Sequence, residues 1–338
     1  MIYPEFIVPG KSKIAVTAPS DGNSKEYDYR RLDFAEANLK NKGVEVIETA
    51  NVRSSCKGRS SGAEDRARQF MEVWDNPEVS AVISAKGGDF LMEMLTYTDF
   101  DRIRNNPKWF QGYSDNTGLA FTITTLCDIA SVYCNNFNDF AMKEWHKSVD
   151  DNWNMLCGQA IIQTSFEKFQ NGYFDGENGD EGYNLNDKAG WRVVNGKAPV
   201  KMGGRLIGGC LDVLLNIVGT RFDNVKEFVS RYGSDGILWY MESFSLSSEA
   251  VERGLWQLSE AGWFENAAGF IFGRPAFFNS YTDTSYEEAV MNALAKYDVS
   301  VILDADIGHK PPQFTMINGA LCEISYDGVR GTVRYEYR

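Results

Sequence analysis

Ser114 has the sequence setting that points most directly to chemistry, in the stretch WFQGYSDNT at residues 109–117. An apolar run ends at Phe110, Gly112 predicts a sharp turn, and residues 116–127 have the pattern of a helix. A serine at a strand-to-helix turn presents its hydroxyl at the carboxyl edge of a sheet, with neighbouring backbone N–H groups facing the same space. Ser114 is therefore the candidate nucleophile. The alternative is that this serine, or the aspartate after it, only caps the helix.

A nucleophilic serine needs a base, and the chain has two histidines, His146 and His309. His146 has charged neighbours and is expected on the solvated face of a helix. His309 follows a glycine and precedes a Lys-Pro-Pro run, which predicts a loop that fixes its position and exposes its ring. Glu242 directly follows the predicted strand 236–241; an acid at a strand end is usually solvated, but a carboxylate next to a cleft can orient an imidazole.

Gly87 and Gly88 follow a predicted strand at 79–85. One interpretation is an oxyanion hole, with the N–H groups of Gly88 and Asp115 aimed at the carbonyl that the serine attacks. The other is a tight turn into the next helix, because glycine is common in turns.

Alternating elements position these residues. In the first half, the pattern predicts strands at 13–18, 44–47, 79–85 and 129–134, and helices at 28–41, 61–76, 90–95 and 116–127. Strands that alternate with helices favour right-handed crossovers and a doubly wound, largely parallel sheet in an α/β fold. Ligands bind such sheets beyond the carboxyl ends of the strands.

Beyond residue 141, helices and strands are again expected, but they do not alternate as regularly. Helices are expected at 142–150, 156–169, 211–218, 248–261 and 285–296, and strands at 236–241, 268–272, 299–303, 319–324 and 332–337. The glycine-rich segment 203–210 is interpreted as a close-packed turn into a helix and matches no phosphate-binding loop.

The composition changes at residues 171–188, which are rich in Gly, Asn and acidic side chains. We therefore expect an N-terminal domain over 1–170, a linker or lid over 171–200, and a C-terminal domain over 201–338. Trp191, in the linker, is interpreted either as a packing anchor or as a ring that stacks on a planar ligand group.

The totals exclude several classes of function. The 338 residues suggest two domains, and 34 lysines and arginines against 47 acidic residues give a net charge of -13, which disfavours a nucleic acid polymer as a partner. Six cysteines without a CxxC pair and only two histidines favour reduced thiols and no metal site. Without a recognisable signal peptide or a long apolar run, we expect a cytoplasmic protein with no membrane partner.

With Ser114, Glu242 and His309 identified, the chain resembles the serine peptidase family of LD-carboxypeptidases and microcin self-immunity proteins. The matching pieces occur in the family's order over nearly the whole chain: the glycine pair 87–88, GYSDNT at 112–117, LIGGCLDVL at 206–214, ILWYMES at 237–243, IFGRP at 271–275 and IGHKPPQ at 307–313. The resemblance implies a triad of Ser114 as nucleophile, His309 as base and Glu242 as orienting acid.

The resemblance also implies oxyanion donors at Gly88 and Asp115, substrate contacts at Gly87 and Trp191, and no cofactor. It implies an N-terminal doubly wound domain, a smaller C-terminal α/β domain that carries the acid and the base, and a homodimer. The family includes enzymes that trim a muropeptide across an L,D bond and enzymes that cleave a peptidyl or aminoacyl group from a nucleotide analogue. The segment AGWRVVNGK at 189–197 looks more like the second, immunity branch.

Two other classes of function remain open at this point. A protein of this fold without turnover would bind a cell-wall peptide or a nucleotide. An amidotransferase-like enzyme with a cysteine at the elbow is disfavoured because position 114 is serine.

Overall fold

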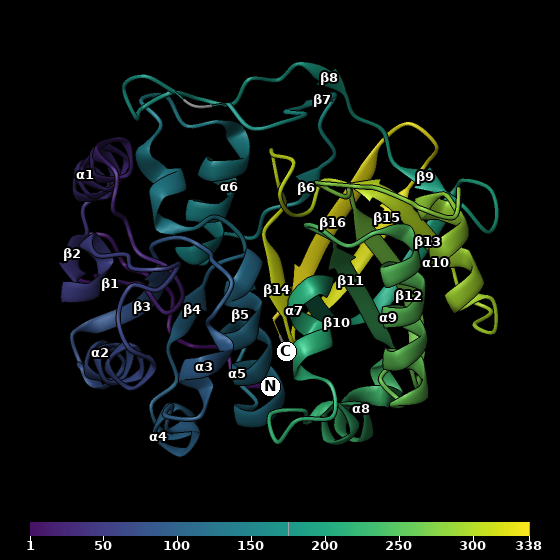
Figure 1. Cartoon of the computed structure of the whole chain (residues 1–338), viewed down its shortest axis with the longest axis horizontal. Coiled ribbons are helices and arrows are strands. Elements are labelled where there is room, and N and C mark those ends of the chain that lie inside the picture. Colours follow the sequence, from purple (N-terminus) through teal and green to yellow (C-terminus); the bar gives the residue numbers. More distant parts are fainter. Residues whose placement is uncertain (175, 338) are drawn as a thin grey trace. The chain divides into compact units, whose positions relative to one another are not determined.

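A computed structural model describes residues 1–174 and 176–337, which form two compact units (Figure 1). The first unit comprises Met1–Ala160, Tyr173–Asn184 and Thr315–Ile317. The second comprises Ile161–Gly172, Leu185–Phe314 and Asn318–Arg338. The expected linker or lid at 171–200 is thus divided between the two units, and Asp175 within it lies outside the described residues.

The first unit is built on a six-stranded sheet in the order β14-β5-β4-β3-β1-β2, in which the pairs β1–β2, β1–β3, β3–β4 and β4–β5 are parallel. Its strands are β1 (Lys13–Thr17), β2 (Glu45–Glu48), β3 (Val79–Ser84), β4 (Trp109–Gln111), β5 (Ser131–Tyr133) and, from late in the chain, β14 (Met316–Asn318). Its α-helices are α1 (Glu26–Asn41), α2 (Ala63–Asp75), α3 (Met92–Leu95), α4 (Phe100–Asn105), α5 (Thr117–Cys127) and α6 (Lys147–Leu156). The predicted parallel-rich α/β architecture is confirmed.

Helix α5, which follows Ser114, is almost completely buried. Ten of its eleven residues are buried, including Leu119, Phe121 and Ile123. A helix that is buried on all sides lies within the core, here with its threonines enclosed as well. By contrast α1 buries one stripe, Leu32, Ala35 and Leu39, at helical spacing. The enclosed helix gives the residues at its N-terminus a rigid support.

The second unit holds an eight-stranded mixed sheet in the order β6-β16-β15-β10-β11-β12-β13-β9. Its strands are β6 (Gln163–Thr164), β9 (Arg192–Val193), β10 (Val200–Cys210), β11 (Ile237–Glu242), β12 (Ala267–Gly273), β13 (Val301–Ala305), β15 (Leu321–Tyr326) and β16 (Gly331–Glu336). The run from β10 to β13 is parallel, and the remaining pairs are antiparallel. The helices are α7 (Leu211–Ile217), α8 (Val225–Tyr232), α9 (Ser248–Glu260) and α10 (Tyr286–Leu294), and β7 (Lys168–Phe169) pairs with β8 (Asp187–Lys188). Figure 1 shows α9 and α10 side by side.

Three predicted elements were wrong. The helix expected at 156–169 is replaced by an extended segment with β6 and β7, and the helix expected at 142–150 begins only at Lys147. The turn expected at 203–210 is part of the long strand β10, whose glycines allow close approach of a neighbouring strand: a Cβ on Gly208 would be 1.7 Å from the carbonyl oxygen of Tyr240. Two helices, α4 and α8, were not anticipated.

Among the described residues, no helix combines the length and apolar character needed to cross a bilayer. All six cysteines are free thiols.

Candidate functional site

Ser114 lies at a strained turn between β4 and α5. Its φ is +65°, in the left-handed region, which costs a non-glycine residue roughly 1–2 kcal/mol. Hydrogen bonds fix this conformation: the Ser114 N–H donates to the hydroxyl of Tyr133 at 3.3 Å, and the Thr117 hydroxyl donates to the Ser114 carbonyl at 2.7 Å. Backbone strain of this kind concentrates at functional sites, where the surroundings impose it. The local geometry matches the expected nucleophile elbow.

Helix α5 has Asn116 as its N-cap residue, and the Asn116 side chain makes no capping hydrogen bond. The Asp115 carboxylate instead accepts hydrogen bonds from the Ser20 hydroxyl and from the Leu91 N–H, the latter at 2.8 Å. Burial raises the pKa of the Asp115 carboxyl. The Asp115 side chain is therefore hydrogen-bonded to two neighbouring loops, while its backbone N–H lies in the turn that follows Ser114.

Gly87 lies directly against the candidate nucleophile. A Cβ at this position would be 2.9 Å from the Cβ and 3.0 Å from the Oγ of Ser114. Contacts this short are essentially never seen for real Cβ atoms, so the position requires glycine. Residues 85–91 form an irregular loop, and α3 starts only at Met92. The pair 87–88 therefore lies in a loop that passes beside Ser114 and leads into α3.

The peptides that carry the two expected oxyanion donors are both anchored through their carbonyl groups. The Asp21 N–H donates to the Gly87 carbonyl at 3.4 Å, and Thr117 binds the Ser114 carbonyl as described above. In a trans peptide the N–H points opposite to the C=O, so these anchors also fix the N–H directions of Gly88 and Asp115. Within residues 1–174 and 176–337, neither N–H donates a hydrogen bond to the protein. Both donors are available for a ligand.

Glu242 and His309 form a close pair in the second unit. Nδ1 of His309 lies 2.8 Å from Oε2 of Glu242, and the two side chains are 5% and 0% exposed. With Nδ1 donating to the carboxylate, Nε2 of the imidazole is left as the proton acceptor. The two residues are 67 positions apart in the sequence. The fold brings them together because Glu242 ends β11 and His309 lies on the loop after β13.

The loop around His309 is packed to hold this pair. The Phe244 ring lies 4.6 Å from the imidazole, centroid to centroid. Earlier in the loop, the buried Asp306 accepts hydrogen bonds from Arg274 at 2.7 Å and from the indole of Trp191 at 2.9 Å. Burial raises the pKa of the Asp306 carboxyl, although the guanidinium opposes the shift. These contacts anchor the segment three residues before His309.

Trp191 is only 3% exposed, and its ring contacts Phe314 and Tyr326. Gly331 lies against one face of it, since a Cβ there would be 2.4 Å from the indole. This setting fits the packing-anchor interpretation of Trp191. Its indole N–H supports the loop of His309 through Asp306.

His146 does not lie on a solvated helix face, so that prediction was wrong. Its ring nitrogen accepts a hydrogen bond from the Ser148 N–H at 3.1 Å and caps helix α6, and the ring lies 5.4 Å from that of Tyr183. Burial lowers the pKa of His146. A residue used as a neutral cap is a weaker candidate for the base than His309.

Sequence reasoning missed the supporting residues Ser20, Arg66, Phe244 and Asp306. Ser20 follows β1 in the turn cluster Pro-Ser-Asp-Gly, so its place at the carboxyl end of a strand was a usable signal. Arg66 interrupts the apolar stripe of α2 and is fully buried, as the neighbouring Ala67 and Phe70 are. A charged residue in such a stripe indicates a buried ionic network.

The first unit thus carries an elbow serine with two available backbone donors, and the second carries a buried acid–imidazole pair. A hydroxyl, an imidazole oriented by a carboxylate and paired N–H donors are the components of acyl transfer by a serine enzyme.

Comparison with known proteins identifies relatives over the full length of the chain. A protein of Vibrio cholerae named "Putative carboxypeptidase" is 25% identical and aligns with 99% of this chain and 96% of its own. The microcin self-immunity protein MccF of Escherichia coli is 24% identical over 95% of this chain and 92% of its own. Among solved structures, an MccF-like protein from Bacillus anthracis str. Ames has a TM-score of 0.81 at 22% identity and covers 100% of both chains.

Two family models match in order. The model described as the LD-carboxypeptidase N-terminal domain matches residues 14–134, and the one described as the LD-carboxypeptidase C-terminal domain matches residues 203–324. Together they cover more than half of the chain. The chain therefore belongs to the LD-carboxypeptidase family, as its order of motifs predicted.

Proposed function

We propose that the protein is a serine peptidase that hydrolyses an amide bond with a triad of Ser114, His309 and Glu242. The observation that carries this proposal is the buried Glu242–His309 pair, with 2.8 Å between Oε2 and Nδ1. The strained elbow at Ser114, with its φ of +65°, supplies the matching nucleophile. Membership of a carboxypeptidase family supports hydrolase chemistry.

In this mechanism Nε2 of His309 takes the hydroxyl proton of Ser114 as Oγ attacks the substrate carbonyl. Glu242 holds the imidazole in the required tautomer and stabilises the imidazolium that forms. The imidazolium then gives its proton to the leaving amine, the C–N bond breaks, and an acyl group remains on Ser114. Water, deprotonated by His309, hydrolyses the ester. No step calls for a metal or a cofactor.

The N–H groups of Gly88 and Asp115 stabilise the negative oxygen of the tetrahedral intermediate in this proposal. Two preorganised backbone donors in a site shielded from water are a large contribution to catalysis, and removal of one such donor typically costs about 10²–10³ in kcat. Gly87 gives the substrate carbonyl access, because position 87 has no side chain between the loop and Ser114.

For the substrate, we infer a molecule of the kind expected for the microcin-immunity branch. The bond cleaved would be an amide at a carboxyl-terminal position or one that joins an aminoacyl or peptidyl group to a nucleotide. Solved structures of MccF hold glutamyl sulfamoyl guanosine and aspartyl sulfamoyl adenosine. The structural alignments with them cover 99% and 100% of this chain, respectively. The second candidate is a muropeptide with an L,D bond. It is supported by a muramoyltetrapeptide carboxypeptidase from Oxalobacter formigenes, with a TM-score of 0.73 at 20% identity over 96% of this chain. We place the reaction in the cytoplasm and assign the active form as a homodimer.

A hydrolysis assay tests these proposals. Wild type and Ser114→Ala are offered an L,D-muropeptide and, separately, a cleavable aminoacyl nucleotide together with its non-hydrolysable mimic. The wild type is expected to cut the aminoacyl nucleotide, and the variant is expected to lose turnover roughly 10⁴-fold or more. Cleavage of the muropeptide alone would assign the cell-wall branch. Tight binding of a ligand with no cleavage of either would indicate a binding protein that lacks turnover.

A further inference from the structure

The hydroxyl of Ser20 touches both residues to which oxyanion donors are assigned. Ser20 is fully buried in the turn after β1, and its Oγ donates a hydrogen bond to Oδ2 of Asp115. The same Oγ lies against Gly88, since a Cβ there would be only 2.3 Å from it. One small polar group therefore contacts both the Asp115 side chain and Gly88, the two residues whose N–H groups face the reacting carbonyl in the proposed mechanism.

The turn that carries Ser20 is itself held in place. The Ser60 N–H donates to the Ser20 carbonyl at 3.1 Å, and the Asp21 N–H binds the Gly87 carbonyl. Oγ of Ser60 donates to the Ala18 carbonyl at 2.6 Å. These bonds fix the backbone on both sides of Ser20, so its hydroxyl has a defined position relative to Gly88.

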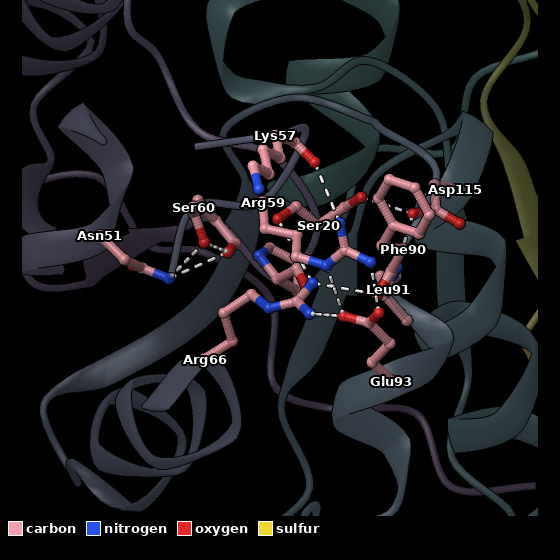
Figure 2. A network of polar contacts seen from close by, with 12 residues as sticks. Ser20, Asn51, Lys57, Arg59, Ser60, Arg66, Phe90, Leu91, Glu93 and Asp115 are labelled. Atoms are coloured by element: carbon pink, nitrogen blue, oxygen red, sulfur yellow. Dashed lines mark hydrogen bonds and ion pairs between the residues drawn. The ribbon is translucent and has the colours of Figure 1, made fainter. Parts of the chain in front are cut away.

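Arg66 connects this turn to the loop that contains Gly88 and Leu91. Its Nη1 donates to the carbonyl oxygens of Pro19 and Phe90, each at 3.0 Å, and its Nη2 binds Glu93 at 2.7 Å. Figure 2 shows its guanidinium and that of Arg59 converging on the same Glu93 carboxylate. A planar guanidinium with several fixed donors suits the joining of backbone carbonyls from two loops.

We propose that Ser20 is a positioning residue that sets the spacing of the Gly88 and Asp115 N–H groups. This inference rests on the proposed function. Without the hydroxyl, Oδ2 of Asp115 keeps the hydrogen bond from the Leu91 N–H, and the contact between Asp115 and Gly88 through Ser20 is lost. The hydrogen bonds to the Gly87 and Ser114 carbonyls still set the N–H directions, but the distance between the two loops loses one of the contacts that fix it. Because an oxyanion hole acts on the transition state, the loss appears in kcat while KM stays nearly unchanged.

Ser20→Ala tests this role, and Ser60→Ala is its matched control. Both remove a buried hydroxyl that donates one hydrogen bond in the same cluster, but Ser60 contacts neither Asp115 nor Gly88 through its side chain. Ser20→Ala is expected to lower kcat roughly 10- to 100-fold with KM within about twofold, because small misplacements of catalytic groups cost up to about 10² in rate. Ser60→Ala is expected to keep kcat within a few-fold of the wild type. Its Tm is expected to fall by about as much as that of Ser20→Ala.

A double-mutant cycle with Asp115→Ala identifies the path of the effect. If Ser20 acts through Asp115, the double variant loses no more kcat than Asp115→Ala alone. Should Ser20→Ala fail to fold, Asp115→Ala answers the same question, since a selective loss of kcat supports the spacing role and an unchanged kcat overturns it.

Equal kcat values for Ser20→Ala and Ser60→Ala, or additive losses in the cycle, would overturn the inference. Failure of the proposed function has a different signature. If Ser114→Ala retains turnover, the nucleophile is wrongly assigned, whereas an inactive Ser114→Ala with a fully active Ser20→Ala removes only the role of Ser20.

Discussion

The carboxylate of Glu242 occupies the space that a side chain at position 308 would need. A Cβ on Gly308 would be 2.4 Å from Cγ and 2.5 Å from Oε2 of Glu242, and the φ of Gly308 is +86°. The residue next to His309 is thus glycine for two reasons, a left-handed backbone and the close approach of the acid that binds the imidazole. The two halves of the acid–base pair are fitted to each other through this contact.

Gly308→Ala is expected to abolish most activity, by roughly 10²-fold or more in kcat, because the new methyl group displaces Glu242 and disorients His309. Gly190→Ala is the control in the same unit, since a Cβ there meets nothing within 4 Å. Steady-state kinetics of both variants check this prediction. Equal activity in the two would show that the fit between Gly308 and Glu242 does not matter for turnover.

Gly87→Ala is expected to disable the nucleophile without unfolding the protein. The added Cβ would lie 3.0 Å from Oγ of Ser114 and push that side chain from its position. We expect a loss of roughly 10²-fold or more in kcat/KM by analogy with other misplaced nucleophiles. Gly62→Ala serves as control because its Cβ would meet open space. Turnover of Gly87→Ala at the level of the control would contradict the assignment of Ser114.

Trp191→Phe separates the two interpretations of this residue. Loss of the indole N–H leaves the buried Asp306 with one donor fewer, which costs about 1–3 kcal/mol of stability. We therefore expect a lower Tm and the same fractional loss of kcat on a muropeptide and on an aminoacyl nucleotide. A rise in KM confined to the nucleotide substrate, with Tm unchanged, would instead indicate that the ring stacks on the base.

His146→Asn is expected to flatten the pH dependence of stability. Burial lowers the pKa of His146 in the folded state below its ordinary value of 6.5, so just below pH 6.5 the unfolded chain binds more protons at this residue. The free energy of unfolding therefore falls as the pH drops through this range, and protonation removes the helix cap. Asparagine caps without titrating.

Thermal melts of the two proteins between about pH 7 and pH 5 measure this effect. The Tm of the wild type should decrease more than the Tm of His146→Asn over that interval. An equal loss in both would show that the ring does not titrate as a cap.

Local sequence signals were sufficient for the framework. The alternation of apolar strands and amphipathic helices in the first half predicted the parallel-rich sheet, and the end of β11 and the Gly-His-Lys-Pro loop placed Glu242 and His309 where they meet. Positions at the carboxyl ends of parallel strands converge whatever their separation along the chain. The residue pattern made Glu242 and His309 candidates, and the family resemblance supplied the expectation that they form a pair.

The errors arose where distant contacts override local preference. Segment 203–210 contains four glycines and predicts a turn, but it lies in β10, where Gly204 and Gly208 are so close to the backbone of Gly236 and Tyr240 that a side chain would not fit. Residues 156–169 have helical spacing, yet β6 pairs with β16 from the far end of the chain. His146 and Ser20 gain their roles from hydrogen bonds that no periodicity encodes.

Active-site labelling shows whether Ser114 is a nucleophile activated by His309 and Glu242. A fluorophosphonate probe is incubated with wild type, Ser114→Ala, His309→Ala and Glu242→Gln, and the modified peptide is mapped by mass spectrometry. We expect one adduct, on Oγ of Ser114 in the wild type, with labelling absent in Ser114→Ala, lost in His309→Ala and strongly slowed in Glu242→Gln. An adduct on another residue, or labelling of Ser114 at an undiminished rate in His309→Ala, would contradict this expectation.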